Sequence, residues 1–466
     1  MLAATCVSAF IVNANTSAVT ILLPAIGRDV GASTSTLQWA VTGYSMVGAA
    51  VIVTGGVLGD ILGRRRVFTA ALGLFTVSCV LIALAGSGAG VIAGRAVQGA
   101  AGATLLACGL SLLSVAASGP EQLRAVSLWG AASAAGAAAG PLVGGALVDS
   151  TGWQGLFWID AVIAVLCVPL TLRTVAESRD PDRPRTVDVV GMLLIALALV
   201  SLVLALSKGA DWGWTSPATI GCLLDAGFAT VAFVAVERRV RVPLVDLRLL
   251  RNGILVAATL VILIVAGAIN GLMYVISLYF QDPAGLGMTP FQAGLATLPA
   301  AAGVVLVAPF VSGLAARAGA RAVVMAGSAI TTVGFAILAV AGGSWAYGLF
   351  VLPLVVVAVG MGLANGCASA AATAAVAARE VGAASGISNM ARYVGAALLT
   401  AAAATVYGSA EPEHLIDGVN RSAVLMALVS ALGVLIAVLY GRLRPRAARP
   451  VDRAAAAAAV AHTVGT

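Results

Sequence analysis

Long apolar runs separated by short polar or basic segments dominate the hydrophobic pattern of this chain. A membrane-spanning helix needs about 20 mostly apolar residues to cross about 30 Å of hydrocarbon. Fourteen runs meet this length, near residues 5–27, 38–59, 67–86, 88–110, 123–148, 154–172, 188–207, 215–236, 253–280, 291–315, 321–341, 345–368, 384–408 and 421–441. Because the runs are continuous rather than alternately apolar and polar, the strands of a membrane barrel are excluded. We predict an all-α, polytopic membrane protein.

The composition leads to the same conclusion. Of the 466 residues, 61% are hydrophobic and only 10% are charged, whereas a soluble surface needs about a quarter to a third of charged residues. A soluble enzyme, a disordered chain and a DNA-binding domain are therefore excluded. The net charge of +7 is scattered in short clusters between apolar runs, so we expect a lipid bilayer and no nucleic acid as partner.

The basic residues predict the orientation. With the N-terminus in the cytoplasm, 21 of the 26 basic residues fall in cytoplasmic loops or the tail, Arg28, Lys208 and Arg421 fall outside, and Arg95 and Arg392 fall within spans. This is the distribution that the positive-inside rule requires, and a helix count wrong by one would scramble it. We expect a multi-pass protein of the cell (plasma) membrane with both termini cytoplasmic. The first run has no basic leader, so we keep it as a helix rather than a signal peptide.

Two similar turns suggest an internal repeat. Residues 56–66 and 312–321 both form short, Gly-containing, basic connections, eight runs apart. Because eight is six plus two, we expect two six-helix bundles and a two-helix insert, the layout of transporters that rock about a shared site. The predicted divisions are an N-terminal six-helix bundle (1–173), the insert with its cytoplasmic linkers (174–252), a C-terminal six-helix bundle (253–441) and a cytoplasmic tail (442–466).

Several motifs occur in order along the chain. They are the turn with Gly56, Leu58, Asp60, Gly63, Arg64 and Arg65; Gly94-Arg95-Ala96-Val97-Gln98-Gly99; the glycine-rich run with Gly136, Gly140, Pro141, Gly144 and Gly145; and Asp188-x-x-Gly191. In these motifs, and over nearly its whole length, the chain resembles the fourteen-helix drug:proton antiporter family of the major facilitator superfamily. The resemblance implies a major-facilitator-type fold that exchanges a small-molecule substrate for protons.

The resemblance also implies roles for two of these motifs. The turn around Asp60 would act as a cytoplasmic gate, in which the carboxylate latches the two bundles by accepting bonds from a neighbouring helix N-terminus. The glycines at 136, 140 and 144 form a small-xxx-small face that permits close helix approach, which generic packing alone would also explain. With Pro141 and Gly145, which complete the family's antiporter motif, they would form a tight hinge between the bundles.

The chain departs from the family at one position. Asn15 stands where the family usually has Asp, and an amide cannot take up and release a proton. Arg95, with Gln98 one turn away, is a costly cation inside a span and is expected to face the protein interior. Asp160 lies at a similar depth, and we propose it as the coupling acid, with Asp225 in the insert and Asp60 as alternatives. Arg95 would otherwise attract an anionic group of the substrate.

Other intramembrane polar residues are weaker candidates. Arg392 lies nearer the cytoplasmic end of its span, where snorkelling explains it as well as function does. Asn270, Tyr274, Asn365 and Asn389 lie on presumed central helices, where single polar residues often only bond a neighbouring helix. We name these four residues as candidates that line the cavity, with bonding between helices as the alternative explanation.

Enzymatic signatures are absent from the sequence. The one lysine, Lys208, follows Leu206-Ser207, so a Walker A motif cannot exist. The two histidines, His414 and His462, stand apart, which leaves no zinc constellation and no reason to expect a metal or cofactor. We predict a proton-coupled exporter of small amphipathic compounds rather than an enzyme. The alternatives are a dedicated exporter of one natural product and a non-transporting membrane sensor. The sequence leaves the oligomeric state open, with a monomer as the simplest expectation.

Overall fold

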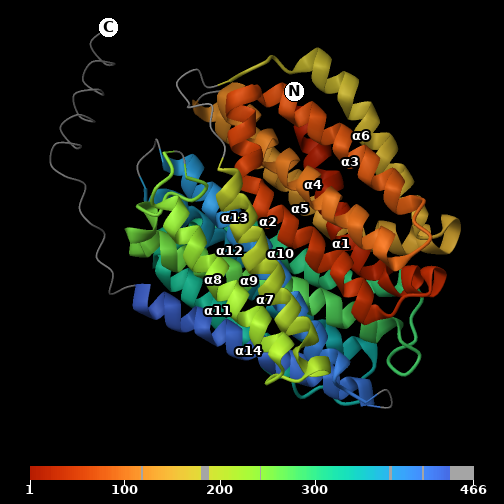
Figure 1. Cartoon of the computed structure of the whole chain (residues 1–466). Coiled ribbons are helices and arrows are strands. Elements are labelled where there is room, and N and C mark those ends of the chain that lie inside the picture. The colour runs from red at the N-terminus through yellow and green to blue at the C-terminus, as the bar shows by residue number, and fades with distance from the viewer. Residues whose placement is uncertain (117–118, 180–187, 242, 377–379, 412–413, 441–466) are drawn as a thin grey trace, which may run out of the picture.

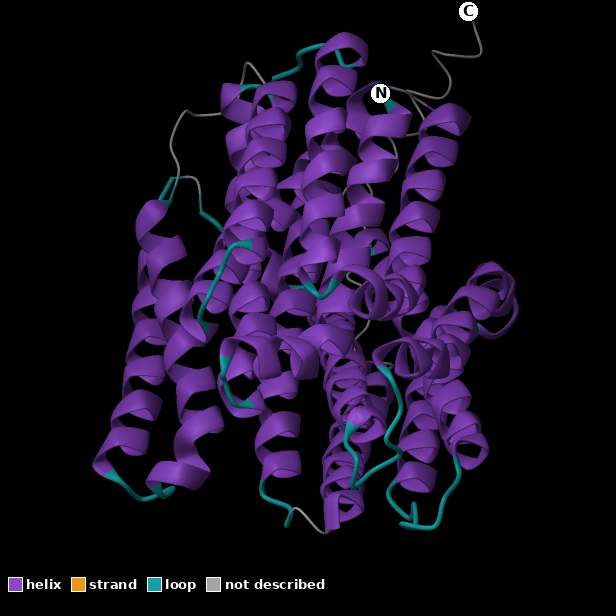
Figure 2. Cartoon of the chain, turned by 90° about the vertical axis from the view of Figure 1, so that its right-hand side faces the viewer, coloured by secondary structure: helices purple, strands orange, loops and turns teal. Residues whose placement is uncertain are grey.

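The computed structural model describes residues 1–116, 119–179, 188–241, 243–376, 380–411 and 414–440. Within these residues it contains fourteen α-helices long and apolar enough to cross a membrane, one short 3-10 helix and no strand (Figure 2). The prediction of an all-helical chain with fourteen spans is therefore confirmed. The elements are α1 (Leu2–Val30), α2 (Thr34–Leu62), α3 (Arg64–Ala83), α4 (Gly88–Ala116), α5 (Gly119–Thr151), α6 (Gln154–Thr174), α7 (Val189–Trp212), α8 (Pro217–Glu237), η1 (Leu249–Arg251), α9 (Gly253–Gln281), α10 (Pro290–Ala318), α11 (Ala320–Leu338), α12 (Tyr347–Ala374), α13 (Val381–Gly408) and α14 (Leu415–Tyr440).

Most helices extend several residues beyond one or both ends of the apolar run that predicted them, and polar side chains cap the starts of several helices. Thr289 begins α10 with a capping box, in which its hydroxyl accepts from the Gln292 amide and Gln292 bonds back to Thr289 N–H. Asn252 caps α9 through the N–H groups of Ile254 and Leu255. The predicted tail (442–466) lies outside the described residues.

The helices pack as two groups and a pair. Helices α1–α6 contact one another, α9–α14 contact one another, and α7 pairs with α8. Figure 1 shows α1–α6 together at the upper right and most of the later helices at the lower left. We call the end of the molecule where α1 begins, which also carries the α2–α3 and α10–α11 turns, the basic end, and the other the opposite end.

Helix α7 lies across the seam between α2 and α13. Its apolar side chains join both helices in one buried cluster, made of Met46, Ala49, Leu199, Val203, Ala397 and Ala401. Toward the opposite end, Gln38 of α2 donates to Ser207 Oγ at 3.0 Å, and Thr405 of α13 donates to the Leu206 carbonyl at 3.0 Å. The two neighbouring residues of α7 are thus bonded to different groups of helices.

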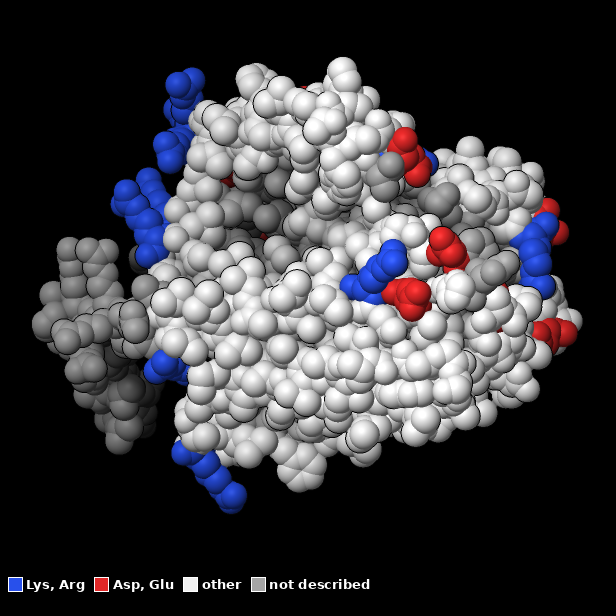
Figure 3. All heavy atoms as spheres, turned by 90° about the horizontal axis from the view of Figure 1, so that it is seen from below, with Lys and Arg blue, Asp and Glu red and all other residues white. Residues whose placement is uncertain are grey.

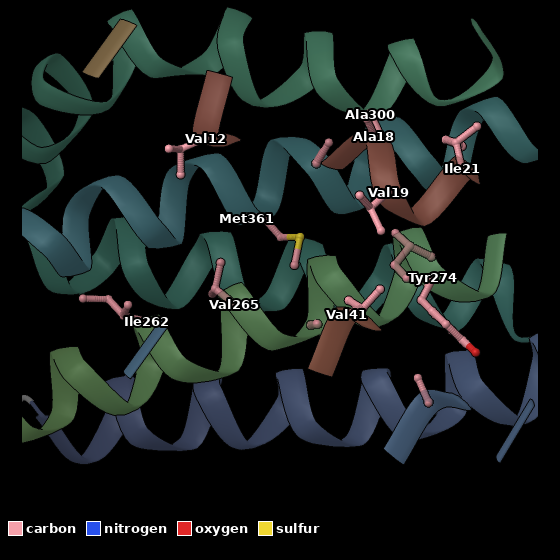
Figure 4. Packing of buried hydrophobic residues seen from close by; sticks show 14 of the residues in the cluster. Val12, Ala18, Val19, Ile21, Val41, Ile262, Val265, Tyr274, Ala300 and Met361 are labelled. Atoms are coloured by element: carbon pink, nitrogen blue, oxygen red, sulfur yellow. The ribbon is translucent and has the colours of Figure 1, made fainter. Parts of the chain in front are cut away.

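The two groups also meet directly through α1 and α9. Ser277 Oγ donates to the Thr20 carbonyl at 2.9 Å, and Gln281 Nε2 donates to the Ile21 carbonyl at 3.0 Å, both in the half nearer the opposite end. Figure 4 shows the apolar packing around this contact, where α1 side chains such as Val19 lie beside Tyr274 of α9. Apolar burial of this kind stabilises the contact between α1 and α9.

Candidate functional site

A chain of hydrogen bonds in the core of the first helix group joins the four residues proposed for coupling. Asn15 Nδ2 of α1 donates to Asp160 Oδ2 of α6 at 2.7 Å. Arg95 Nη1 of α4 donates to Asn15 Oδ1 and to Gln98 Oε1, each at 2.5 Å. The exposed fraction is 4% for Asp160 and 0% for the other three side chains. The Asn15 amide therefore stands between a buried carboxylate and a buried guanidinium and bonds to both.

The Arg95 guanidinium has further partners that sequence reasoning missed. Its Nε donates to the Ala40 carbonyl at 3.1 Å, and its Cζ lies 4.3 Å from the centroid of the Tyr44 ring, a cation–π contact. Gln98 Nε2 in turn donates to Cys79 Sγ at 3.0 Å, so the Cys79 thiol belongs to this polar chain. Arg95 Nη2 is buried without a hydrogen-bond partner. One donor of the site therefore remains available.

The site reaches the second helix group through aromatic rings. The Tyr44 ring lies 6.4 Å, centroid to centroid, from the ring of Tyr393 on α13. Gly48, one turn along α2, leaves room for that ring, since a Cβ there would lie 2.5 Å from Tyr393 Cε1. Arg95, Tyr44 and Tyr393 thus form a continuous path from the buried charges to the seam between the groups.

The proposed gate is a sharp turn bonded to the end of α6. Gly63 has φ +113°, a conformation that side chains rarely adopt, and it lets α3 begin directly after α2. Asp60 Oδ1 accepts from Arg64 of the same turn, 2.8 Å from Nη2. Glu177 Oε1 accepts the Arg65 backbone N–H at 3.0 Å, and Arg65 Nη1 donates to the Val175 carbonyl at 3.4 Å. These bonds lie within the first helix group. Gly56, which opens this motif, lies on α2 facing α4, where a Cβ would be 3.9 Å from Ala107.

The second turn repeats this geometry. Gly319 has φ +84° and precedes α11 as Gly63 precedes α3. Two residues later, Arg321 donates to the carbonyls of Ala437 and Val438 near the end of α14, at 3.2 and 3.0 Å. Arg65 occupies the corresponding position, two residues after Gly63. The weak sequence repeat therefore corresponds to a repeated structural device.

Replacing Gly63 by Ala is expected to destabilise the protein by about 1–3 kcal/mol, the range for a residue held in a sparsely populated conformation. The added Cβ would also lie 2.6 Å from the Glu177 carboxylate. Thermal unfolding of the purified variant checks this. Gly73→Ala on α3 is the matched control, because nothing lies within 4 Å of a Cβ at that position. Equal melting temperatures for the two variants would contradict the strained turn.

The glycines of α5 pack against α1 at a regular spacing. A Cβ at Gly136 would meet the Phe10 carbonyl, one at Gly140 would meet the Ala14 carbonyl, and one at Gly144 would lie 3.0 Å from Ala18 Cβ. Contacts four residues apart on both helices indicate two parallel helices in close approach. The sequence predicted the small-residue face; the structure assigns α1 as its partner.

The end of the same motif touches the second helix group. A Cβ at Gly145 would lie 2.7 Å from Phe291 Cα on α10, and one at Gly294 would meet the Pro141 carbonyl. Both contacts lie toward the opposite end, as do the α1–α9 hydrogen bonds. The glycine-rich run therefore packs on its own group along most of its length and on the other group at its end.

The weaker candidates are spread over other helices. Arg392 Nη2 donates to Ser369 Oγ at 2.6 Å, and its Nε has no partner. Asn365, one turn before Ser369, has a buried Oδ1 without a donor. Asp225 of α8 accepts from Ser201 Oγ of α7 at 2.5 Å, away from Arg95. Asn270 donates to the Ala266 carbonyl of its own helix.

The surface separates charge along the molecule. Figure 3 shows several Lys and Arg side chains gathered at one end, and the face in view is hollowed in the half nearer to them. Arg183, Arg185 and Arg379, which also supported the predicted orientation, lie outside the described residues. Among the residues that are described, no group of three or more His, Cys, Asp or Glu could hold a metal ion.

Comparison with known proteins agrees with this architecture. The family model described as Major Facilitator Superfamily matches residues 5–400. The chain is 33% identical to the multidrug resistance protein Stp of Mycobacterium tuberculosis over 398 residues, covering 85% of this chain and 73% of that protein. It is 32% identical to the cephamycin export protein CmcT of Amycolatopsis lactamdurans over 409 residues, covering 87% and 84%.

A further relative and a solved structure extend the comparison. The probable actinorhodin transporter of Streptomyces coelicolor is 32% identical over 425 residues, covering 88% of this chain and 73% of that protein. The crystal structure of a bacterial homolog of the human lysosomal transporter Spinster, inward-facing and unoccupied, superposes with a TM-score of 0.67 at 13% identity, covering 95% and 96%. With this fold and a family match over most of its length, the chain belongs to the Major Facilitator Superfamily of membrane transporters.

Proposed function

We propose that this transporter is a secondary active exporter of small amphipathic compounds, driven by proton influx through alternating access. The two groups of helices would tilt about the space between them, with both termini on the cytoplasmic side. The names of two relatives, a multidrug resistance protein and a cephamycin export protein, support export as the direction of transport. Each proton moving inward across 100 mV provides about 2.3 kcal/mol, enough for roughly tenfold or greater accumulation.

Asp160 is the coupling acid in this proposal. Within the described residues it is the carboxylate bonded to the Asn15–Arg95 pair. Protonation would neutralise Asp160, weaken its bond to Asn15 and leave the Arg95 charge without a nearby anion. Asn15 itself keeps its protons and passes the change on by reorienting its amide. In this proposal the proton-binding role that the family usually gives to an Asp at position 15 is taken by Asp160 on another helix.

The observation that carries this mechanism is that α1 takes part in both the charged site and the contact between groups. Asn15 bonds Asp160 and Arg95, and five residues later the Thr20 carbonyl accepts from Ser277 of α9. Because α1 is one rigid helix, a shift at Asn15 moves that contact. The stack of Arg95, Tyr44 and Tyr393 provides a second connection to α13.

A dedicated exporter of one natural product is the second candidate. Two relatives that cover most of this chain are named for single compounds, actinorhodin and cephamycin. Susceptibility profiling in a pump-deficient host, with and without a protonophore, distinguishes the candidates. We expect increased tolerance to several unrelated amphipathic compounds, lost on adding the protonophore. Tolerance to one compound alone would support the dedicated exporter, and no change for any compound would contradict export.

A further inference from the structure

Two buried carboxyl groups meet where the two-helix insert closes at the basic end. Asp188 precedes the first residue of α7, and Glu237 is the last residue of α8. Their exposed fractions are 7% and 4%. Neither belongs to the Asp160 site, which lies on α1, α4 and α6. Such burial is rare for Asp and Glu unless a partner compensates the charge.

Backbone N–H groups occupy one side of each carboxyl group. Asp188 Oδ1 caps α7 by accepting from Gly191 N–H at 2.7 Å. Glu237 Oε2 accepts from Val245 N–H at 3.1 Å, and Oε1 accepts from Leu244 N–H at a longer 3.3 Å. Glu237 thereby fixes the chain that leaves α8. The oxygen with the weaker backbone bond, Oε1, has the most capacity left for another partner.

That remaining oxygen faces Asp188. A Cβ built on Gly191 would lie 2.7 Å from Glu237 Oε1 and would also meet Asp188 Oδ2, so both oxygens converge over the same glycine. Asp188 Oδ2 is buried and has no hydrogen-bond donor. Since two ionised carboxylates are both acceptors, a hydrogen bond between these converging oxygens needs a proton.

Neighbouring cations do not neutralise the pair in the described part of the chain. The arginines of the segment between α8 and α9 are exposed, and none forms an ion pair with either carboxyl group among the described residues; they are Arg238, Arg239, Arg241, Arg248 and Arg251. Asp246 accepts from Arg248 N–H. On α7 and α8, Lys208 and Asp211 pair at the far end, and Asp225 bonds Ser201. Arg183 and Arg185 lie outside the described residues.

We propose that Asp188 and Glu237 share one proton and form a pH-sensitive clasp that holds the start of α7 against the end of α8. The proton lies between Glu237 Oε1 and Asp188 Oδ2, and each remaining oxygen keeps its backbone N–H. Losing it to a hydroxide ion or water leaves two adjacent anions, which repel each other and open the clasp. Because α7 packs on α2 and α13, the clasp positions the helix that covers their seam.

The sign of the pH dependence follows from proton binding. Above about pH 5 an unfolded chain has released the protons of its Asp and Glu residues. The folded chain still holds the shared proton, so raising the pH favours unfolding by up to tenfold per pH unit until that proton is lost. Stability from the clasp is therefore complete in mild acid and declines toward alkaline pH.

Asp188→Asn tests the proposal in the full chain, purified and placed in lipid nanodiscs. Asn is as good a helix cap as Asp, and its Nδ2–H would donate to Glu237 Oε1 in place of the shared proton. Between about pH 5 and pH 8, the melting temperature of the wild type should fall, whereas that of Asp188→Asn should fall markedly less. Asp211→Asn, an exposed acid on the same helix, is the control and should follow the wild type.

Infrared spectroscopy provides a readout that does not depend on unfolding. The wild type at neutral pH should show the carbonyl stretch of a protonated carboxyl group, and Glu237→Gln should remove that band while Asp211→Asn keeps it. A band that Glu237→Gln and Asp188→Asn both leave unchanged would overturn the proposal, as would identical pH profiles of melting temperature for Asp188→Asn and the wild type. Neither result depends on which compound is exported.

Discussion

Replacing Asp160 by Asn is expected to abolish proton-driven export while leaving the protein folded and inserted. Asn has nearly the shape of Asp, and its carbonyl can still accept from Asn15 Nδ2, which now bonds Asp160 Oδ2 at 2.7 Å. What the variant loses is the capacity to bind and release a proton. The accumulation ratio of the transported compound across the membrane should fall by the factor that one proton provides, roughly tenfold or more at 100 mV.

The measurement is uptake of a transported compound into inverted vesicles with an imposed pH gradient, beside downhill exchange without a gradient. Asp160→Asn should lose the gradient-driven uptake and retain the downhill exchange. Asp225→Asn is the matched control, because Asp225 is also an acid inside a span but bonds Ser201 on the insert. Gradient-driven uptake that survives Asp160→Asn and disappears in Asp225→Asn would transfer the coupling role to the insert.

Gly140→Ala is expected to reduce both stability and transport, although it adds one methyl group. That methyl group would meet the Ala14 carbonyl and Ser17 Oγ, so α1 must move away from α5. Overpacking a tight interface costs about 1–3 kcal/mol. Asn15 directly follows Ala14, and its bonds to Arg95 and Asp160 depend on the position of α1. Displacing α1 therefore disturbs the charged site as well as the packing.

Gly130→Ala on the same helix provides the control. Nothing lies within 4 Å of a Cβ at Gly130, and replacing an exposed helical glycine by alanine favours the helix by up to about 1 kcal/mol. The melting temperature and vesicle transport of Gly130→Ala should equal or exceed those of the wild type, whereas Gly140→Ala should be lower in both. Similar behaviour of the two variants would show that α5 tolerates separation from α1.

The spans were predictable because their signal is local. Apolar length, the spacing of glycines on α5 and the basic turns can each be recognised within a short stretch, so fourteen helices and the small-residue face followed directly from the sequence. The partner of that face was not predictable, since nothing in residues 136–144 specifies α1. The exact helix ends were less predictable, because a cap such as Thr289 is set by a polar residue and not by the length of the apolar run.

The charged site was only partly predictable. Arg95 and Asp160 could be recognised as unusual because an ionisable side chain inside a membrane span costs free energy. The hydrogen bond from Asn15 to Asp160 could not be predicted, because it joins positions 145 residues apart and depends on how α1 and α6 pack. Two partners lacked any local signal: a backbone carbonyl at Ala40 and the thiol of Cys79. Glu177, which holds the turn after α2, lies in a polar stretch where an acid is unremarkable.

Helix α7 makes the two sides of this transporter unequal toward the surrounding lipid. Helix α7 covers the seam between α2 and α13 and is bonded to Gln38 on one flank and to Thr405 on the other, whereas among the described residues α5 and α10 pack on each other without extensive contact to α7 or α8. A hydrophobic molecule dissolved in the bilayer would therefore meet a covering helix at one flank and the α5–α10 contact at the other. We expect any sideways exchange with the membrane to take place at the α5–α10 flank, which distinguishes the two sides of an otherwise twofold arrangement.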